Sequence, residues 1–248
     1  MVVVAGSRRP ITARAAILAA NILGGSSLLA FGIFLFRGPL HLVELARSDI
    51  EALLIDAALS LAFFVQHSGM VRKSTRDLLA GHLPRHYHGA IYSIASGVVL
   101  WVLLILWQPT SSVVVTFSYP LRLLFRALFI AAVVSFVWGI RALGSFDGFG
   151  VRPIRAHLRG EPLRELPLTI RGPYRWVRHP LYTMVLVMIW SSPDLSADRL
   201  LLNVTWTLWI VVGALLEERD LVEDFGEDYR RYRSMVPMLI PWRIPRDC

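Results

Sequence analysis

Cysteine is nearly absent from this sequence, since Cys248 is the one cysteine among 248 residues. A disulfide within the chain is therefore excluded, and scattered histidines beside a single cysteine lack the ligand spacing of a zinc site. The glycine fingerprint of a dinucleotide-binding fold is missing as well, because the glycines of Phe146–Gly150 belong to a turn and not to a strand–helix unit. Internal repeats and low-complexity segments are also missing. We therefore expect neither a metal centre nor a Rossmann fold.

Apolar residues, in contrast, are abundant. They make up 55% of the chain and give a mean hydropathy of +0.53, whereas a soluble domain is about 45–50% apolar. Several runs approach or exceed the roughly 18 residues that indicate a membrane span. The expected membrane segments are about Ala15–Phe36, Ala52–Val71, Gly89–Trp107, Leu121–Ala142, Pro180–Trp190 and Leu200–Leu216.

These segments predict an all-α fold, a polytopic membrane helical bundle of about six segments. The fifth segment is too short to cross a hydrocarbon core of about 30 Å unaided, and the turn Ser191–Asp194 joins it to the sixth as a C-terminal helical hairpin. Arg8, Arg9 and Arg14 precede the first segment as in a signal peptide, but that segment is long enough to span. We expect residues 1–248 to form a single integral-membrane domain, with a four-helix membrane portion at 1–142.

The basic residues are distributed unevenly along the chain. Lysine and arginine number 26 against 18 acidic residues, a formal net charge of +8. A basic balance can indicate nucleic-acid binding, but here the charge gathers in loops beside apolar segments, so we expect no nucleic-acid partner. Six segments place 21 of the 26 basic residues on one side. The positive-inside rule makes that side cytoplasmic, with both termini and the loop at 143–179, in a membrane of the bacterial inner-membrane type.

The stretch Arg171–Tyr182 combines four arginine or histidine side chains with three aromatic residues at the start of an apolar segment. Pro173 and Pro180 fix the backbone there. A residue before proline avoids the helical region, so His179 should lie at a break and Pro180 should open the next helix. Arginines and aromatic residues also collect at membrane edges as plain anchors. Composition alone leaves both interpretations open.

Two adjacent carboxylates, Glu217 and Glu218, end the last apolar segment. They point about 100° apart on a helix, so at most one of them faces a given pocket. Glu217 shares a face with Leu221, so we expect it to point inward, where it could hold an ammonium group, and we expect Glu218 to point elsewhere. The alternative is that both carboxylates are simply solvated.

Polar side chains within an apolar segment usually face a cavity, because they are costly to expose to lipid. Gln66 and His67 lie near the cytoplasmic end of the second segment. His67 could act as a base near neutral pH, or it could only hydrogen-bond a carbonyl oxygen. Asp56, about three turns away towards the other end of the same segment, could instead pair with an arginine of another span.

Five motifs follow one another over about residues 171–241. They are Gly-Pro-Tyr-x-x-Val-Arg-His-Pro-x-Tyr, a helical hairpin, Glu-Glu-x-x-Leu, Phe-Gly-x-x-Tyr-x-x-Tyr and Val-Pro-x-x-Ile-Pro. This order resembles the isoprenylcysteine carboxyl methyltransferase and phospholipid methyltransferase superfamily. Three further segments resemble the methanethiol S-methyltransferase and NnrU-like branch: Phe64–Arg72, Trp107–Pro109 and Phe146–Gly150.

The resemblance implies a methyltransferase whose cytoplasmic site binds S-adenosylmethionine within residues 143–248. It implies that Tyr174, His179, Pro180 and Tyr182 line the cofactor pocket, and that Glu217, with Glu218 beside it, binds the methionine ammonium. The implied acceptor is a small apolar thiol, with methanethiol converted to dimethyl sulfide. A thiolate is the competent nucleophile, and His67, Arg178 or His179 could stabilise it or accept its proton.

Other functions remain open at this stage. A phospholipid or prenylcysteine acceptor is one alternative, and a non-catalytic NnrU-like accessory protein in contact with membrane lipids is another. The isoprenylcysteine enzymes carry an arginine one turn before the glutamate, where this chain has Gly213. That difference disfavours a prenylcysteine carboxylate as the acceptor.

Overall fold

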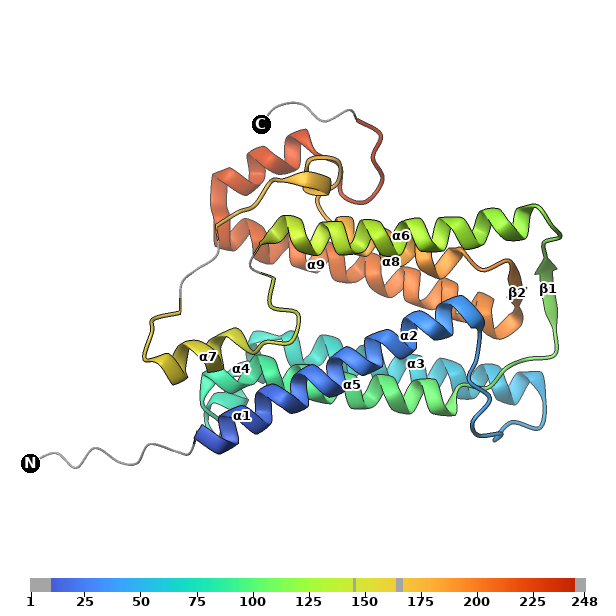
Figure 1. Cartoon of the computed structure of the whole chain (residues 1–248), viewed down its shortest axis with the longest axis horizontal. Coiled ribbons are helices and arrows are strands. Elements are labelled where there is room, and N and C mark those ends of the chain that lie inside the picture. Colours follow the sequence, from blue (N-terminus) through green and yellow to red (C-terminus); the bar gives the residue numbers. More distant parts are fainter. Residues whose placement is uncertain (1–9, 145, 164–166, 244–248) are drawn as a thin grey trace, which may run out of the picture. The chain divides into compact units, whose positions relative to one another are not determined.

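The computed structural model describes residues 10–144, 146–163 and 167–243 (Figure 1). Arg8, Arg9 and Cys248 lie outside the described residues. Helices dominate the described chain, and the strands are limited to β1 (Val113–Thr116) and β2 (Asp194–Ser196). The chain divides into two compact units, one of residues 1–32, 61–104 and 147–165, and one of residues 33–60, 105–146 and 166–248.

Five stretches of helix are long and apolar enough to cross a membrane: Thr12–Arg37, Asp49–Val71, Arg85–Leu106, Leu121–Leu143 and Ala197–Met235. The short apolar helix α8 (Pro180–Trp190) coincides with the fifth segment that the sequence predicted, the one too short to cross a membrane unaided. The first stretch includes most of α1 (Pro10–Ala19), a short π-helical segment at Ala20–Gly24 and α2 (Gly25–Arg37). The expectation of an all-α, polytopic membrane protein is therefore confirmed.

The surfaces of these helices are apolar where a soluble protein would be polar. In α6 (Leu121–Leu143) only 17% of the most apolar window is buried within the protein. Leu123, Ile130 and Val134 on this helix are each more than half exposed. Large apolar side chains exposed in this number are expected of a helix that faces lipid.

The first unit contains α1, α4 (Lys73–Ala80), α7 (Arg152–Arg159) and large parts of α2, α3 (Asp49–Val71) and α5 (His88–Leu106). Ala13, Ala20, Ala90 and Ile154 form a buried cluster there. Gly89 and Gly150 have no side chains, so their backbones pack directly against each other. A Cβ at Gly89 would lie 2.7 Å from the Gly150 Cα.

The loop expected at 143–179 contains more structure than the sequence predicted. Helix α7 begins after Asp147, whose carboxylate accepts hydrogen bonds from the backbone N–H groups of Val151 and Arg152 at 3.0 and 2.7 Å. A carboxylate in this position satisfies donors that the first turn of a helix leaves unpaired. Gly160, in the left-handed conformation, ends the helix.

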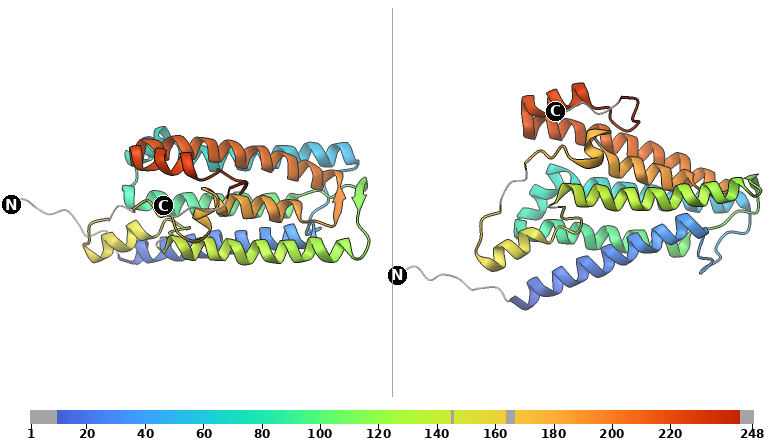
Figure 2. Two further views of the ribbon diagram at one scale, coloured as in Figure 1. Left: turned by 90° about the horizontal axis from the view of Figure 1, so that it is seen from above. Right: turned by 45° about the horizontal axis from the view of Figure 1, so that its top comes forward.

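In the second unit α8 lies between α6 and α9 (Ala197–Met235), as Figures 1 and 2 show. The predicted hairpin of α8 and α9 is present. Its connection is not only a tight turn, because β2 pairs antiparallel with β1 at this end of the unit. An ion pair of 2.6 Å between Arg122 and Asp194 fixes α6 to the same connection.

Several polar side chains are buried near this end of the second unit. Asp198 accepts hydrogen bonds from the Trp107 indole at 3.1 Å and the Thr110 hydroxyl at 2.8 Å. Asp56 is fully buried and accepts the backbone N–H of Gln108 at 2.8 Å. The possibility that Asp56 pairs with a span arginine is wrong for the described residues, because its hydrogen bond goes to the chain that follows α5.

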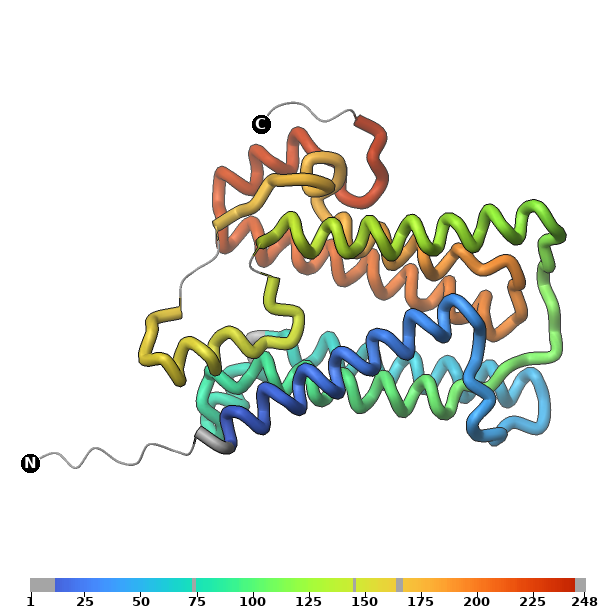
Figure 3. Tube along the Cα trace, in the orientation of Figure 1, coloured from blue at the N-terminus to red at the C-terminus, as the bar shows by residue number. Residues whose placement is uncertain are grey.

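Helix α9 bends sharply near its end. Gly226 has φ 57° and ψ −127°, a conformation that is foreign to a helix and is adopted readily by glycine. Figure 3 shows the C-terminal part of α9 turning back on itself. The turned segment buries Tyr229, Tyr232 and Val236 in a cluster with Leu221.

Candidate functional site

The turn at Arg171–Tyr182 has the backbone that its prolines predict. A 3-10 helix covers Gly172–Arg175, His179 is non-helical at φ −119° and ψ 63°, and α8 starts at Pro180. Gly172 has a positive φ and packs on Trp138 and Ala142 of α6. The turn is therefore anchored to a membrane helix.

The segment after α9 holds the other side of this turn. The backbone N–H groups of Arg178 and His179 donate to the carbonyl oxygens of Pro237 and Met238 at 2.9 and 3.1 Å. The Thr183 hydroxyl donates to the Leu239 carbonyl at 2.8 Å. These bonds join the fifth predicted motif segment, Val236–Pro241, to the turn and to the start of α8.

Glu218 lies at the centre of the site and is 3% exposed. Its Oε1 accepts hydrogen bonds from the Arg178 Nε at 2.7 Å, from the His179 Nε2 at 2.8 Å and from the Tyr229 hydroxyl at 2.7 Å. Its Oε2 accepts from the Arg178 Nη2 at 2.9 Å. This carboxylate is therefore fully occupied by the protein itself.

Arg178 is equally well occupied. Besides the two bonds to Glu218, its Nη1 donates to the carbonyl oxygens of Arg233, at 3.1 Å, and Val236. A buried charge pair is stable when hydrogen bonds satisfy most of the donors of its cation, as they do for this guanidinium. The prediction that Arg178 contacts a thiolate is disfavoured by this geometry, which suits a residue that positions others.

Glu217 differs from its neighbour in being 44% exposed at the side chain. Its Oε2 accepts a hydrogen bond from the Tyr182 hydroxyl at 2.7 Å and lies 3.9 Å from the His179 Nδ1. The His179 ring also stacks on the Tyr182 ring, with centroids 5.5 Å apart. Within the described residues Oε1 of Glu217 has no hydrogen-bond partner, so it can accept one from a ligand.

The expectation about which glutamate points inward is wrong. Glu218 is the buried member of the pair, and Glu217 is the accessible one. The reason is the bend at Gly226, which brings Tyr229 back to Glu218 and encloses it. The two carboxylates lie on opposite sides of the His179 ring, so one can hold the ring while the other stays open.

The remaining predicted pocket residues lie in the same unit. Pro180 is buried, and Tyr174 is 9% exposed, with its carbonyl oxygen accepting the Tyr232 hydroxyl at 2.6 Å. Burial, and secondarily the negative charge of Glu217, raises the pKa of the Tyr174 phenol. The phenol thus stays protonated and can donate a hydrogen bond.

A shallow groove of about 230 Å³ adjoins these residues. Its lining combines arginines with apolar side chains: Arg178, Arg233, Ser234, Val236, Pro237, Met238, Trp242 and Arg243. Arg233 also approaches Glu218, at 3.5 Å. The groove gives the site a cationic rim.

Of the predicted site residues, the structure brings Tyr174, His179, Pro180, Tyr182 and the two glutamates together in the second unit. His67 belongs to the first unit. Its Nε2 lies 2.5 Å from the Tyr92 hydroxyl, and its ring is 5.2 Å from that of Phe63. The histidine is thus held by an aromatic partner on the neighbouring helix α5.

Sequence reasoning missed the roles of Tyr229 and Tyr232. The motif Phe-Gly-x-x-Tyr-x-x-Tyr contained both tyrosines, and its glycine was the signal for a bend. Without the bend, residues 218 and 229 would be about 16 Å apart along a straight helix. Among the described residues no group of three or more histidine, cysteine, aspartate and glutamate side chains could hold a metal ion.

Comparison with known proteins finds methanethiol S-methyltransferases and nurim among the relatives of this chain. The chain is 37% identical over 201 residues to a methanethiol S-methyltransferase of a Pseudomonas strain, covering 77% of this chain and 74% of that protein. It is 36% identical over 197 residues to the methanethiol S-methyltransferase of Pseudomonas deceptionensis, covering 77% and 73%. It is 29% identical over 192 residues to nurim of Rattus norvegicus, covering 71% and 70%. No protein-family model and no solved structure matches the chain.

The helices and the enclosed glutamate site define an integral membrane protein with a polar site at the end of its membrane segments. The chain belongs to the methanethiol S-methyltransferase family. It is accordingly a membrane methyltransferase.

Proposed function

We propose that the protein transfers a methyl group from S-adenosylmethionine to the sulfur of methanethiol and releases dimethyl sulfide. Both Pseudomonas relatives named above carry the name of a methanethiol S-methyltransferase. The observation that best supports the donor site is the Glu217 carboxylate, which is half-exposed and has one oxygen held by Tyr182. A carboxylate in such a position suits the ammonium of an amino-acid ligand, since hydrogen bonds between charged groups are the strong ones.

The donor site contains two kinds of residue. Some contact the ligand, and others position the residues that contact it. Glu217 accepts the ammonium, and Tyr174, His179, Pro180 and Tyr182 form the wall. Glu218 supports the site through His179 and Arg178 instead of touching the ligand, because its oxygens are already bonded. S-adenosylmethionine, when bound, supplies a methyl group on a positively charged sulfur.

The acceptor must lose a proton for the reaction to balance. The thiol S–H bond and the bond between the donor's methyl group and its sulfonium sulfur would break, a new carbon–sulfur bond would form, and S-adenosylhomocysteine and one proton would be released. His67 accepts that proton in our proposal, because it is a polar group in an apolar helix whose ring is oriented by Tyr92. Positioning supplies much of the rate of an in-line displacement. A small apolar thiol also dissolves in lipid, which suits a membrane enzyme.

The charge distribution supports a proposal for the side of the membrane on which the donor site lies. We propose that the protein lies in an inner membrane of bacterial type, with both termini and the donor site facing the cytoplasm. We also propose that residues 1–248 act as one methyltransferase domain, in which residues 143–248 bind the donor.

A panel of acceptors tests this function. Purified protein is incubated with methyl-labelled S-adenosylmethionine and, separately, with methanethiol, a prenylcysteine and a phospholipid. We expect labelled dimethyl sulfide from methanethiol and little label in the other acceptors. Label transferred to the lipid alone would replace the thiol by a lipid acceptor, and failure to bind the donor would favour an accessory protein.

A further inference from the structure

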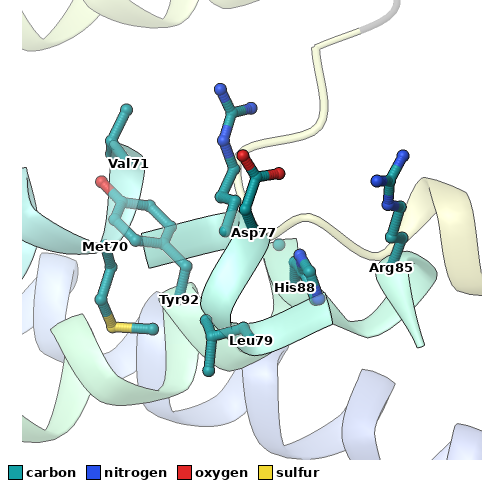
Figure 4. A pocket seen from close by; sticks show the side chains of 9 residues that line it. Met70, Val71, Asp77, Leu79, Arg85, His88 and Tyr92 are labelled. Carbon is teal, nitrogen blue, oxygen red and sulfur yellow. The ribbon is translucent and has the colours of Figure 1, made fainter. Parts of the chain in front are cut away.

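A second pocket, of about 520 Å³, lies entirely within the first unit (Figure 4). It opens at the end of α3 and the start of α5, beside α4, which comes between these two helices in the sequence. Its lining residues come from these three helices and the short turn before α5: Met70, Val71, Arg76, Asp77, Leu79, Arg85, His88, Gly89 and Tyr92. The donor site does not use any of them.

The rim of this pocket carries two unpaired positive charges. Arg76 and Arg85 are exposed, and in the described part of the chain neither guanidinium has a hydrogen-bond or ion-pair partner. Asp77 is the acid among the lining residues, so the rim stays positive overall. His88 contributes a further polar edge, and its Nε2 donates to the Leu83 carbonyl at 3.2 Å. Figure 4 shows the Arg85 and His88 side chains over one side of the pocket.

The wall of the pocket is apolar, in contrast to the rim. Met70, Val71 and Leu79 contribute aliphatic or thioether groups, and Tyr92 contributes its ring. The Tyr92 hydroxyl is already engaged with His67. An occupant should therefore combine an anionic end with an apolar end.

The position of the pocket along the chain fixes its depth in the membrane. One candidate span ends at Val71 and the next begins at Arg85. Residues at the ends of spans lie at the level of the lipid headgroups. The charge distribution assigns this side to the cytoplasm, where anionic lipids attract basic residues.

The size of the pocket argues against the methyl acceptor as its occupant. Pockets of about 300–1,000 Å³ hold ligands of drug size, whereas methanethiol has only two heavy atoms. A phospholipid headgroup with its glycerol fits the volume and the charge pattern better.

We propose that this pocket binds an anionic phospholipid, with its phosphate on Arg76 and Arg85 and its glycerol and first acyl carbons against Met70, Val71 and Leu79. Arginine suits the phosphate because its planar guanidinium can donate two hydrogen bonds at once. This proposal does not depend on the donor site, although Tyr92, which contacts His67, also lines the pocket.

The test measures binding of phosphatidylglycerol to the purified, delipidated full-length protein by native mass spectrometry. Each basic residue near an anionic lipid contributes roughly fivefold in affinity, so the double variant Arg76→Gln, Arg85→Gln should bind about 30-fold more weakly. The corresponding Arg→Lys double variant keeps both charges but loses the paired hydrogen bonds, so its affinity should lie between those of the wild type and the Gln variant. The matched control, Arg14→Gln with Arg155→Gln, removes two exposed arginines of the same unit outside the pocket and should bind like wild type.

Three results would overturn the proposal. The first is unchanged lipid affinity in the Arg76→Gln, Arg85→Gln variant, and the second is an equal loss in the control variant. The third is displacement of the lipid by inorganic phosphate at equal concentration, which would assign the pocket to a soluble phosphate. S-adenosylmethionine binding, measured on the same preparations, should be unchanged in every variant, so a failed donor site would be recognised separately.

Discussion

Glu217 and Glu218 are neighbours in sequence but have different chemical environments. Glu218 is saturated by Arg178, His179 and Tyr229, whereas Glu217 keeps one oxygen open beside Tyr182. A saturated buried carboxylate stabilises the protein, and an open one can bind a ligand. Separate substitutions should therefore have separate effects.

The substitution Glu217→Gln should weaken binding of S-adenosylmethionine. A hydrogen bond to a charged group is worth about 1.5–3 kcal/mol, and partial exposure favours the lower end, so the affinity should fall roughly tenfold. Calorimetry on the purified variant measures the change, with the exposed Glu223→Gln on the same helix as a control. An unchanged affinity in a folded Glu217→Gln protein would remove this residue from the donor site.

The substitution Glu218→Ala should instead lower the stability of the protein. Removing one partner of a buried ion pair leaves the other charge uncompensated and costs about 3–5 kcal/mol. Tyr229→Phe, which removes one hydrogen bond to the same carboxylate, should cost about 1–3 kcal/mol. Thermal unfolding in detergent ranks the variants, and a Glu218→Ala protein as stable as wild type would contradict the network.

The substitution His67→Ala should reduce turnover about 10²- to 10⁴-fold, which is the usual effect of losing a general base. Donor affinity should stay nearly unchanged, because the donor site lies in the other unit. Turnover and calorimetry on one preparation measure both quantities, with the exposed His82→Ala as a control. Normal turnover would exclude His67 as the base, and a loss of both quantities would assign it a structural role.

For individual residues, the local backbone conformation was predictable from the sequence, whereas the burial of side chains was not. The steric rule for a residue before proline predicted the break at His179 and the helix start at Pro180. The choice between the two glutamates depended on Tyr229, which contacts Glu218 only after the chain has turned back. A pattern of neighbouring residues contains no information on such a contact.

At the level of elements, the bend in α9 determines the shape of the site. The Tyr229 hydroxyl lies 2.7 Å from the Glu218 carboxylate, although eleven residues of straight helix would separate them by about 16 Å. Gly226 provides the turn with a positive φ. A Cβ at this position would meet no atom within 4 Å, so its effect would come from the backbone alone.

The substitution Gly226→Ala should lower the free energy of unfolding by about 1–3 kcal/mol, the usual cost of a strained backbone conformation. It should also weaken donor binding, because the turned segment supports Glu218 and the Arg178–His179 turn. Chemical denaturation and calorimetry measure the two effects. Gly213→Ala is the matched control, since a Cβ there also meets no atom within 4 Å and helical alanine is favourable. Equal behaviour of the two variants would refute the role of the bend.

The long apolar helices were the easiest elements to predict, because hydropathy alone marks a run of about 20 residues. Helix α7 and the β1–β2 pair were missed. Helix α7 is short and highly charged, and its start depends on the Asp147 side chain. The two strands lie far apart in sequence, so only the folded second unit brings them together.

For the whole molecule, the charge distribution predicts the orientation in the membrane. A reporter that is active in the cytoplasm should be active when fused after Cys248 and inactive when inserted near Ser111. The physical reason is the positive-inside rule, which holds basic loops in the cytoplasm. The reverse pattern of reporter activity would invert the proposed topology and place the donor site on the side away from cytoplasmic S-adenosylmethionine.

Methyl transfer to a thiol depends, in our proposal, on donor binding at Glu217. The most direct measurement is the release of labelled dimethyl sulfide from methanethiol and methyl-labelled S-adenosylmethionine by purified wild-type and Glu217→Gln proteins over a range of donor concentrations. We expect release by the wild type, and a slower release by the variant that recovers as the donor concentration rises. Absence of labelled dimethyl sulfide from a wild-type protein that binds the donor would contradict the account.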